Sequence, residues 1–364
     1  MSDAAARFAR HDRSAEQSGN GASPSDIAAA KRLGLRHIST EALSIRRRRC
    51  GRGWAYLGAD CRPIRDPKTV RRLARLAVPP AYEDVLYAKD PAAHLQAIGR
   101  DAAGRLQYRY HPQWEQVREL RKARRLARLA DALPRIRRSI GQHLASQAPT
   151  REFASAAVIE LVAYSALRPG SEGYIRLHGT RGAASLLKSN VVADDGMLAL
   201  KFRSKGGKVV TKEFPAPRLA KAIARLRQLP GRRLFRYRAE SGDIRSLTAQ
   251  EVNRFLREIA GVKVSLKDFR TLLASASVLE ALAHTEPAPS ERQRRKQVRA
   301  AVQAVANDLA NTVTICRKSY VHDAVVTAFE DGALGRYSQA LKDCRSPVRR
   351  AKILAKVVTT ELAS

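Results

Sequence analysis

The spacing of apolar residues changes near Trp114, and this change divides the chain into two regions of different secondary structure. Before it, short runs that alternate apolar and polar residues are separated by turns such as Asp101–Gly104, which is the pattern of β-strands. After it, apolar residues recur every three or four positions, which is the pattern of helices. The sequence therefore predicts an α+β fold, with a small, mostly β N-terminal domain at 27–112 and a larger, mainly helical domain at 113–333.

The first region begins after a polar segment. Residues 1–26 are small and polar, so we expect a disordered tail, and a short helical pattern covers 27–35. Trp54, Tyr56 and Leu57 alternate before a turn and predict a hairpin with a basic flank. The remaining elements are a helix in "DPKTVRRLARLAVPP" and strands in "DVLYA", "HLQAIG" and "RLQYRYH".

The second region is predicted to be helical around one small sheet. Residues 114–146 form a basic amphipathic stretch interrupted at Pro134, and "REFASAAVIELVAYSALRPG" is an apolar helix that ends before Pro169-Gly170. The segment "NVVADDGMLALKFRSKGGKVVTKEF" predicts a three-stranded β-meander, because Asp195-Gly196 and Gly206-Gly207 are hairpin signals. Further helices are expected at about 216–228, 248–260, 267–283, 290–310 and 316–330, followed by a basic, poorly packed tail at 334–364.

The charge balance indicates the kind of partner. Lys and Arg number 68 against 34 Asp and Glu, so the formal net charge is +34. Such an excess repels itself unless a polyanion relieves it, and nucleic acid does so with release of counterions. No apolar run approaches the roughly 18 residues of a membrane span. We therefore expect nucleic acid, and no membrane, as the partner.

Two further features concern location and cofactors. The N-terminal sequence lacks the apolar segment of a secretory signal. The four cysteines, Cys50, Cys61, Cys316 and Cys344, show neither CxxC spacing nor a disulfide framework. We therefore expect a cytoplasmic protein with no metal site and no cofactor.

Four stretches place an Arg, Lys or Asn at the end of an element, where a side chain can point into a cleft. They are "ALRPGSE" with Arg168, "FRSKGGK" with Lys205, "LKDFRTLLAS" with Lys267 and Arg270, and "LANTVTICRKSYVHDAV" with Asn311 and Tyr320. Each also has a purely structural explanation. These explanations are a helix cap for Arg168 and Asn311, a solvated turn lysine for Lys205, an exposed basic helix face for Lys267 and Arg270, and half-buried packing for Tyr320.

Taken together, these residue types suit one reaction. A tyrosine hydroxyl can attack a DNA phosphodiester and form a covalent phosphotyrosyl intermediate that conserves the bond energy. Arginine forks match the charge that spreads over the phosphate oxygens, and an amide N–H adds electrostatic stabilisation. A lysine can protonate the departing sugar oxygen. This scheme requires no metal ion.

The same motifs carry a resemblance to a known family. The chain resembles the small type IB DNA topoisomerases of bacteria and poxviruses over roughly residues 30–330. The N-terminal stretches "GRGWAYLGADCRPIRDP", "LAVPPAYEDV" and "HLQAIGRDAAGRLQYRYHPQW" resemble that family's first domain. "KDFRTLLAS" and "NTVTICRKSYVH" resemble its catalytic motifs. The resemblance implies a monomeric, bacterial enzyme that relaxes supercoiled DNA in the nucleoid without ATP.

The resemblance also assigns roles to residues. It implies Tyr320 as the nucleophile, Arg168 and Arg270 as phosphate-binding residues, and Lys205 as the general acid. Asn311 stands nine residues before the tyrosine, where other type IB enzymes carry a histidine. Asparagine can donate a hydrogen bond but cannot act as a base or carry a charge, so the expected role of Asn311 is positioning and hydrogen bonding. The DNA contacts expected in addition are Gln107, Tyr108, Tyr110, Lys267, Arg317 and Lys318. Pro169 and Ser171 depart from the residues that are typical of the loop after the first arginine.

Two other functions fit parts of this pattern. Tyrosine recombinases share the catalytic domain plan, but they carry a histidine at the position of Lys267, and their first domains are usually helical. A non-catalytic, basic DNA-binding protein would also explain the charge. All the groups that the reaction needs are present, however, so the sequence favours a topoisomerase that cuts one strand, forms a 3′-phosphotyrosyl intermediate and religates after strand rotation.

Overall fold

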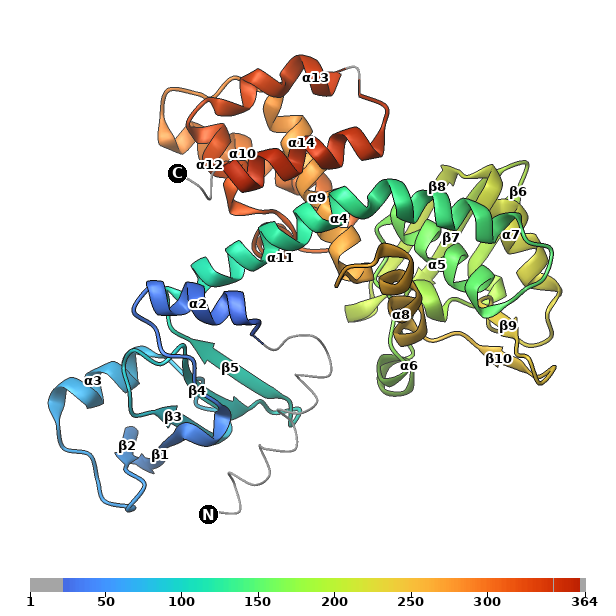
Figure 1. The fold of residues 1–364 in the computed structure, drawn as a ribbon. Helices are drawn as coiled ribbons and strands as arrows, with labels where there is room; N and C mark the ends of the chain where they lie inside the picture. Colours follow the sequence, from blue (N-terminus) through green and yellow to red (C-terminus); the bar gives the residue numbers. More distant parts are fainter. Residues whose placement is uncertain (1–21, 343, 361–364) are drawn as a thin grey trace. The chain divides into compact units, whose positions relative to one another are not determined.

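The computed structural model describes residues 22–342 and 344–360, and the chain divides into two compact units, Met1–Arg121 and Lys122–Ser364. Most of the predicted disordered tail, residues 1–21, lies outside the described residues. The last predicted tail residues instead begin a helix, because Ser23 caps α2 (Pro24–Arg32) by accepting a hydrogen bond from the Asp26 N–H. Figure 1 labels the elements of both units.

The first unit is built on one antiparallel sheet. The strand order is β2-β1-β3-β4-β5, and apolar side chains cover both faces of the sheet. Leu43 and Ile98 lie in one layer, and Ile45 and Tyr87 lie in the other, together with Leu73 of α3. The elements are β1 (Leu43–Cys50), β2 (Gly53–Leu57), α3 (Pro67–Arg75), β3 (Glu83–Ala88), β4 (Leu95–Arg100) and β5 (Leu106–Tyr110), with the short 3-10 helix η1 (Thr40–Ala42) before β1.

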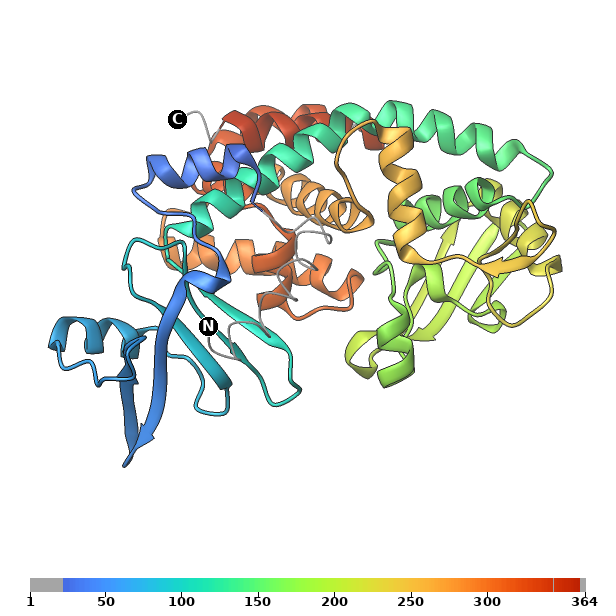
Figure 2. The same cartoon turned by 60° about the horizontal axis from the view of Figure 1, so that its bottom comes forward.

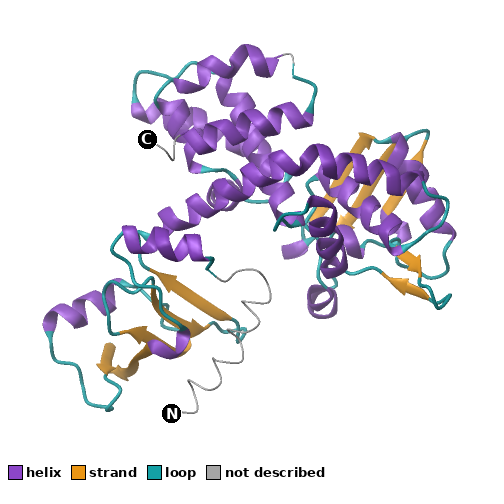
Figure 3. Ribbon diagram, in the orientation of Figure 1, coloured by secondary structure: helices purple, strands orange, loops and turns teal. Residues whose placement is uncertain are grey.

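The second unit combines a three-stranded meander with many helices (Figure 3). Its strands pair in the order β6-β7-β8, with Asp194 opposite Met197 at the first turn and Arg203 opposite Val209 at the second. The strands are β6 (Val191–Asp194), β7 (Met197–Arg203), β8 (Val209–Pro215), β9 (Arg236–Arg238) and β10 (Ile244–Ser246). The helices are α5 (Arg151–Ser165), α6 (Glu172–His178), α7 (Pro217–Gln228), α8 (Ala249–Ala260), α9 (Leu266–Ala283), α10 (Glu291–Asp308), α11 (Val313–Tyr320), α12 (Asp323–Glu330), α13 (Ser338–Lys342) and α14 (Pro347–Thr360).

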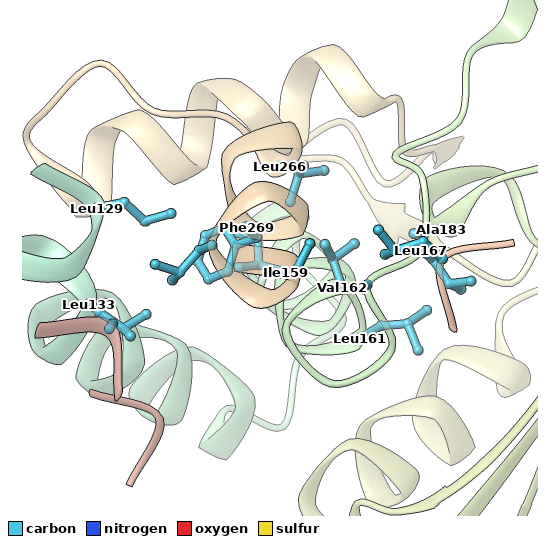
Figure 4. Close-up of a cluster of buried hydrophobic side chains, with 14 of the residues drawn as sticks. Leu129, Leu133, Ile159, Leu161, Val162, Leu167, Ala183, Leu266 and Phe269 are labelled. Atoms are coloured by element: carbon cyan, nitrogen blue, oxygen red, sulfur yellow. The ribbon is translucent and has the colours of Figure 1, made fainter. Parts of the chain in front are cut away.

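The core of the second unit lies where α4 (Trp114–Ala145), α5 and α9 pack together. Leu129 and Leu133 of α4 approach Phe269 of α9, which lies beside Ile159 and Val162 of α5 (Figure 4). Helix α5 is buried on nearly all sides, as its continuous apolar sequence predicts. This packing fixes the end of α5, which precedes Arg168, and the beginning of α9, which carries Lys267 and Arg270.

The predicted α+β class is confirmed, as are the β-rich first region, the meander and most of the helices. The predicted interruption at Pro134 is wrong, because this residue lies inside α4. Figure 2 shows α4 as one long helix. Proline removes one backbone donor from a helix interior, but Leu133 and Ile136 on either side are buried and hold the helix in place. The helix expected at 316–330 is two helices, α11 and α12, and the short helix α6 was not predicted.

The predicted poorly packed tail is also wrong. Residues 347–360 form α14, which buries Leu354, Val357 and Val358 in the main core of the second unit. The basic residues Lys352 and Lys356 lie on its exposed face, so the high charge of the segment conceals an amphipathic helix.

We expect Leu354→Ala to lower the free energy of unfolding by about 2–5 kcal/mol, because a fully buried leucine leaves a cavity when it is truncated. Lys352→Ala, on the exposed face of the same helix, is the matched control and should change stability by less than about 0.5 kcal/mol. Urea denaturation of the full chain measures both values. Equal stabilities of the two variants would contradict the packing of α14.

Candidate active site

Tyr320 is the last residue of α11, and the protein fixes its main chain from two sides. The Ser275 hydroxyl on α9 donates a hydrogen bond to the Tyr320 carbonyl at 2.9 Å, and it accepts one from the His322 N–H at 3.1 Å. Ser275 is completely buried. The half-buried ring of Tyr320 packs at the edge of the main core. The end of α11 therefore has a defined position relative to α9.

Arg270 lies at the centre of the site. Its side chain is buried, with 2% exposure, so the alternative of an exposed basic helix face is wrong for this residue. The guanidinium donates hydrogen bonds to the carbonyls of Ala166, just after α5, and of Leu309, just after α10. Its Cζ atom lies 4.9 Å from the centre of the Tyr320 ring. One side chain therefore connects the ends of two helices with the tyrosine.

Arg168 follows the end of α5 and Asn311 follows the end of α10, and the two residues lie close together. Both helices end with an alanine in the left-handed conformation, Ala166 at φ 51° and Ala310 at φ 49°. After α10, the Asn311 N–H binds the Ala306 carbonyl at 2.9 Å, which completes a Schellman motif. The predicted C-cap role of Asn311 thus needs correction, because Ala310 adopts the capping conformation and the Asn311 side chain is available for the site.

The side chains of Arg168 and Asn311 meet directly. The Arg168 guanidinium donates a hydrogen bond to Asn311 Oδ1 at 2.5 Å and another to the Ser204 hydroxyl at 3.3 Å. Ser204 is buried and immediately precedes Lys205 at the tip of the β7–β8 hairpin. The structure therefore brings together Arg168, Arg270, Asn311 and Tyr320, and it brings the hairpin of Lys205 to the same cluster.

A close backbone contact holds the Arg168 loop. The Ala183 N–H binds the Arg168 carbonyl at 2.8 Å, and Gly182 lies so near the loop that a Cβ on it would come within 2.4 Å of the Gly170 nitrogen. Only glycine fits at this point of contact. The position of Arg168 therefore depends on a residue 14 positions further along the chain.

The electrostatics of the cluster act on Tyr320. Burial of the phenol raises its pKa, but the charge of Arg270 and its hydrogen bond, with the charges of Arg168 and Lys267, outweigh burial, so the pKa of Tyr320 lies below its ordinary value. The neighbouring thiol behaves in the opposite way. Burial raises the pKa of Cys316 to about 11. Of these two nucleophilic groups, the cluster therefore favours the ionised form of the tyrosine.

Two buried donors in the cluster have no hydrogen-bond acceptor among the described residues. They are Arg270 Nε and Asn311 Nδ2. A buried donor without an acceptor is costly, and such groups in native structures call for an explanation. An anion placed between these two side chains would satisfy both, so the site has the chemistry of a small oxyanion pocket.

The other predicted basic residues lie at or near the surface. Lys267, one turn before Arg270 on α9, is exposed, as are Lys205 and Lys318. The Nζ atom of Lys205 lies 4.9 Å from the ring centre of Tyr174 on α6. Arg317 pairs with Asp323, so part of its charge is already compensated.

The three predicted DNA contacts of the first unit lie on β5 and do not share one face. Gln107 donates a hydrogen bond to Asp101 at 3.0 Å. Tyr108 and Tyr110 are two residues apart, so they lie on the same side of the strand, and their rings stack with centres 6.0 Å apart. Tyr110 continues this stack to Trp114 at the start of α4.

Sequence reasoning missed the residues that hold the site together. Ser204, Ser275 and Gly182 act through contacts with residues far away in the chain, and no local motif marks them. Tyr174 was missed because its helix was not predicted. The two left-handed alanines, Ala166 and Ala310, also lack a signal, since glycine or asparagine usually occupies such positions.

Two features are absent from the part of the chain that the structure describes. No three His, Cys, Asp or Glu side chains form a group that could hold a metal ion. No described helix combines the length and the apolar character needed to cross a membrane.

Comparison with known proteins identifies the class. Residues 111–346 match the family described as eukaryotic DNA topoisomerase I, catalytic core, and residues 53–101 match the N-terminal domain of bacterial DNA topoisomerase IB. The chain therefore belongs to the type IB DNA topoisomerases, which are isomerases, and the resemblance read from its motifs is confirmed. The chain is 27% identical over 294 residues to DNA topoisomerase 1B of Acanthamoeba polyphaga mimivirus. The matched region covers 79% of this chain and 88% of the viral protein.

We expect Gly182→Ala to lower the free energy of unfolding by about 1–3 kcal/mol, because the added methyl group collides with backbone atoms of the Arg168 loop. Gly173→Ala, in the nearby helix α6, meets only the Ser171 hydroxyl at 3.6 Å and serves as the control. It should be neutral or slightly stabilising. Thermal and urea unfolding measure both variants, and a Gly182→Ala protein as stable as Gly173→Ala would contradict this role of Gly182.

Proposed function

We propose that this chain relaxes supercoiled duplex DNA by cutting one strand through a 3′-phosphotyrosyl intermediate at Tyr320. The observation that carries the proposal is the convergence of Arg168, Arg270 and Asn311 beside Tyr320, with two buried donors left without acceptors. A phosphodiester supplies the acceptor oxygens that these donors lack. The membership in the type IB topoisomerases supports the same reaction.

The chemistry follows from the charges. The lowered pKa of Tyr320 favours its attack on phosphorus, and the two arginines stabilise the negative charge that the transition state spreads over the phosphate oxygens. Lys205 protonates the departing 5′-oxygen. Because the phosphotyrosyl ester conserves the bond energy, the free 5′-hydroxyl reverses the reaction after strand rotation without ATP or a metal ion.

The partner is duplex DNA. The formal net charge of +34 supports strong, salt-dependent attraction to phosphates. Gln107, Tyr108 and Tyr110 on β5 are proposed to contact DNA from the first unit, and Lys267, Arg317 and Lys318 from the second unit. The protein is proposed to act as a monomer in the cytoplasm, on the bacterial nucleoid.

We expect Tyr320→Phe to abolish relaxation of a supercoiled plasmid and to leave salt-sensitive DNA binding nearly intact, because only the nucleophilic oxygen is removed. The assay contains EDTA, no ATP, and a plasmid without paired recombination sites, so it also separates a topoisomerase from a recombinase. Tyr164→Phe, at an exposed tyrosine of α5, is the matched control. Relaxation by Tyr320→Phe would disprove the mechanism, and an inactive wild type would disprove the activity.

We expect Asn311→Ala to slow DNA cleavage by about 100-fold without eliminating it, because one hydrogen-bond donor to the transition state is lost while both arginines remain. Asn307→Ala, at an exposed position near the end of α10, is the control and should cleave at the wild-type rate. Single-turnover cleavage of a short duplex measures both rates. A wild-type rate for Asn311→Ala would exclude Asn311 from the phosphate pocket.

A further inference from the structure

The hairpin tip that carries Lys205 offers few packing contacts to this side chain. Gly206 and Gly207 follow it at φ 78° and 74°, and a Cβ on either would meet nothing within 4 Å. Two backbone hydrogen bonds close the turn, from Ser204 N–H to the Lys208 carbonyl at 2.8 Å and from Gly207 N–H to the Ser204 carbonyl at 3.0 Å. A lysine in such a place has many rotamers available.

One contact restricts this freedom. The Lys205 ammonium lies over the ring of Tyr174, 4.9 Å from its centre, within the range of a cation–π interaction. The ring is half-buried on α6, and the His178 ring lies 5.7 Å from it. Tyr174 therefore holds the Lys205 ammonium in a partly ordered position.

The same chain segment joins Tyr174 to the phosphate pocket. Arg168 lies six residues before Tyr174, in the loop that Gly182 fixes, and the Arg168 guanidinium binds the hydroxyl of Ser204, the neighbour of Lys205. The backbone next to Lys205 is thus linked to Arg168 through the Ser204 hydroxyl. The Lys205 ammonium group contacts Tyr174, six residues after Arg168.

We propose that Tyr174 is a positioning residue for Lys205, whose ammonium it keeps close to the scissile phosphate. This inference rests on the proposed function. In the step concerned, the Tyr320 hydroxyl loses its proton to water and its oxygen bonds to phosphorus. The bond from phosphorus to the 5′-oxygen breaks, and that oxygen takes a proton from Lys205 Nζ, which becomes a neutral amine. Tyr174 touches neither the phosphate nor the leaving group in this step, and it acts only through the lysine.

The test compares two leaving groups. One duplex carries the ordinary 5′-oxygen at the cleavage site, and the other carries a bridging 5′-sulfur, which leaves as a weakly basic thiolate and needs no proton. We expect Tyr174→Ala to slow single-turnover cleavage of the oxygen substrate by about 2- to 5-fold, the strength of one exposed cation–π contact. Both Tyr174→Ala and Lys205→Ala should cleave the sulfur substrate at the wild-type rate.

Three variants complete the design. Tyr174→Phe keeps the ring and should cleave the oxygen substrate at nearly the wild-type rate. Tyr164→Ala removes an exposed tyrosine that stacks on Phe214, away from Lys205, and should have no effect on either substrate. In the double variant, Tyr174→Ala should add no loss to that of Lys205→Ala, since the ring acts only through the lysine.

The outcomes separate this inference from the proposed function. A Tyr174→Ala defect of equal size on both substrates, or an added loss in the double variant, would overturn the positioning role and leave the reaction intact. If the sulfur substrate does not rescue Lys205→Ala, Lys205 is not the general acid, and the proposed mechanism fails at that step.

Discussion

The site depends on the interactions of the buried Arg270 guanidinium with two helix ends and with Tyr320. A charged group with 2% exposure is unfavourable unless hydrogen bonds compensate for the lost water. Here the carbonyls of Ala166 and Leu309 provide them, and both belong to helix ends, where a cation is favoured. The same group faces the Tyr320 ring. Arg270 therefore stabilises the ends of α5 and α10 and also lowers the pKa of the tyrosine.

The backbone at these helix ends is strained in a way that serves the site. Ala166 and Ala310 both adopt positive φ angles, which cost a non-glycine residue roughly 1–2 kcal/mol each. Such strain concentrates at functional sites, where the surrounding structure enforces it. In this case it turns the chain sharply after each helix, so that Arg168 and Asn311 leave their helices toward each other and form a hydrogen bond.

Much of the fold could be predicted because its signals are local. The glycine turns define the meander, and the apolar spacing defines α5, α9 and α10. The candidate site residues were found because each lies at the end of such an element. Helix α14 also carried a signal, with apolar residues at Ala351, Leu354 and Val358, but its basic residues masked it.

The remaining features depend on tertiary contacts that a sequence pattern does not contain. Pro134 is tolerated because burial of its neighbours outweighs one lost hydrogen bond. Gly182 looks like any loop glycine until the Arg168 loop is placed against it. The same holds for Ser275, whose role appears only when α9 lies beside the end of α11.

The most direct test of the account is to identify the atoms that become bonded during cleavage. The wild-type protein is incubated with a duplex whose short 3′-fragment dissociates after cutting, so that the covalent complex accumulates, and the DNA-linked peptide is analysed by mass spectrometry. The account predicts a single adduct that joins the Tyr320 oxygen to a DNA 3′-phosphate. An adduct on another residue, or on a 5′-phosphate, would contradict it.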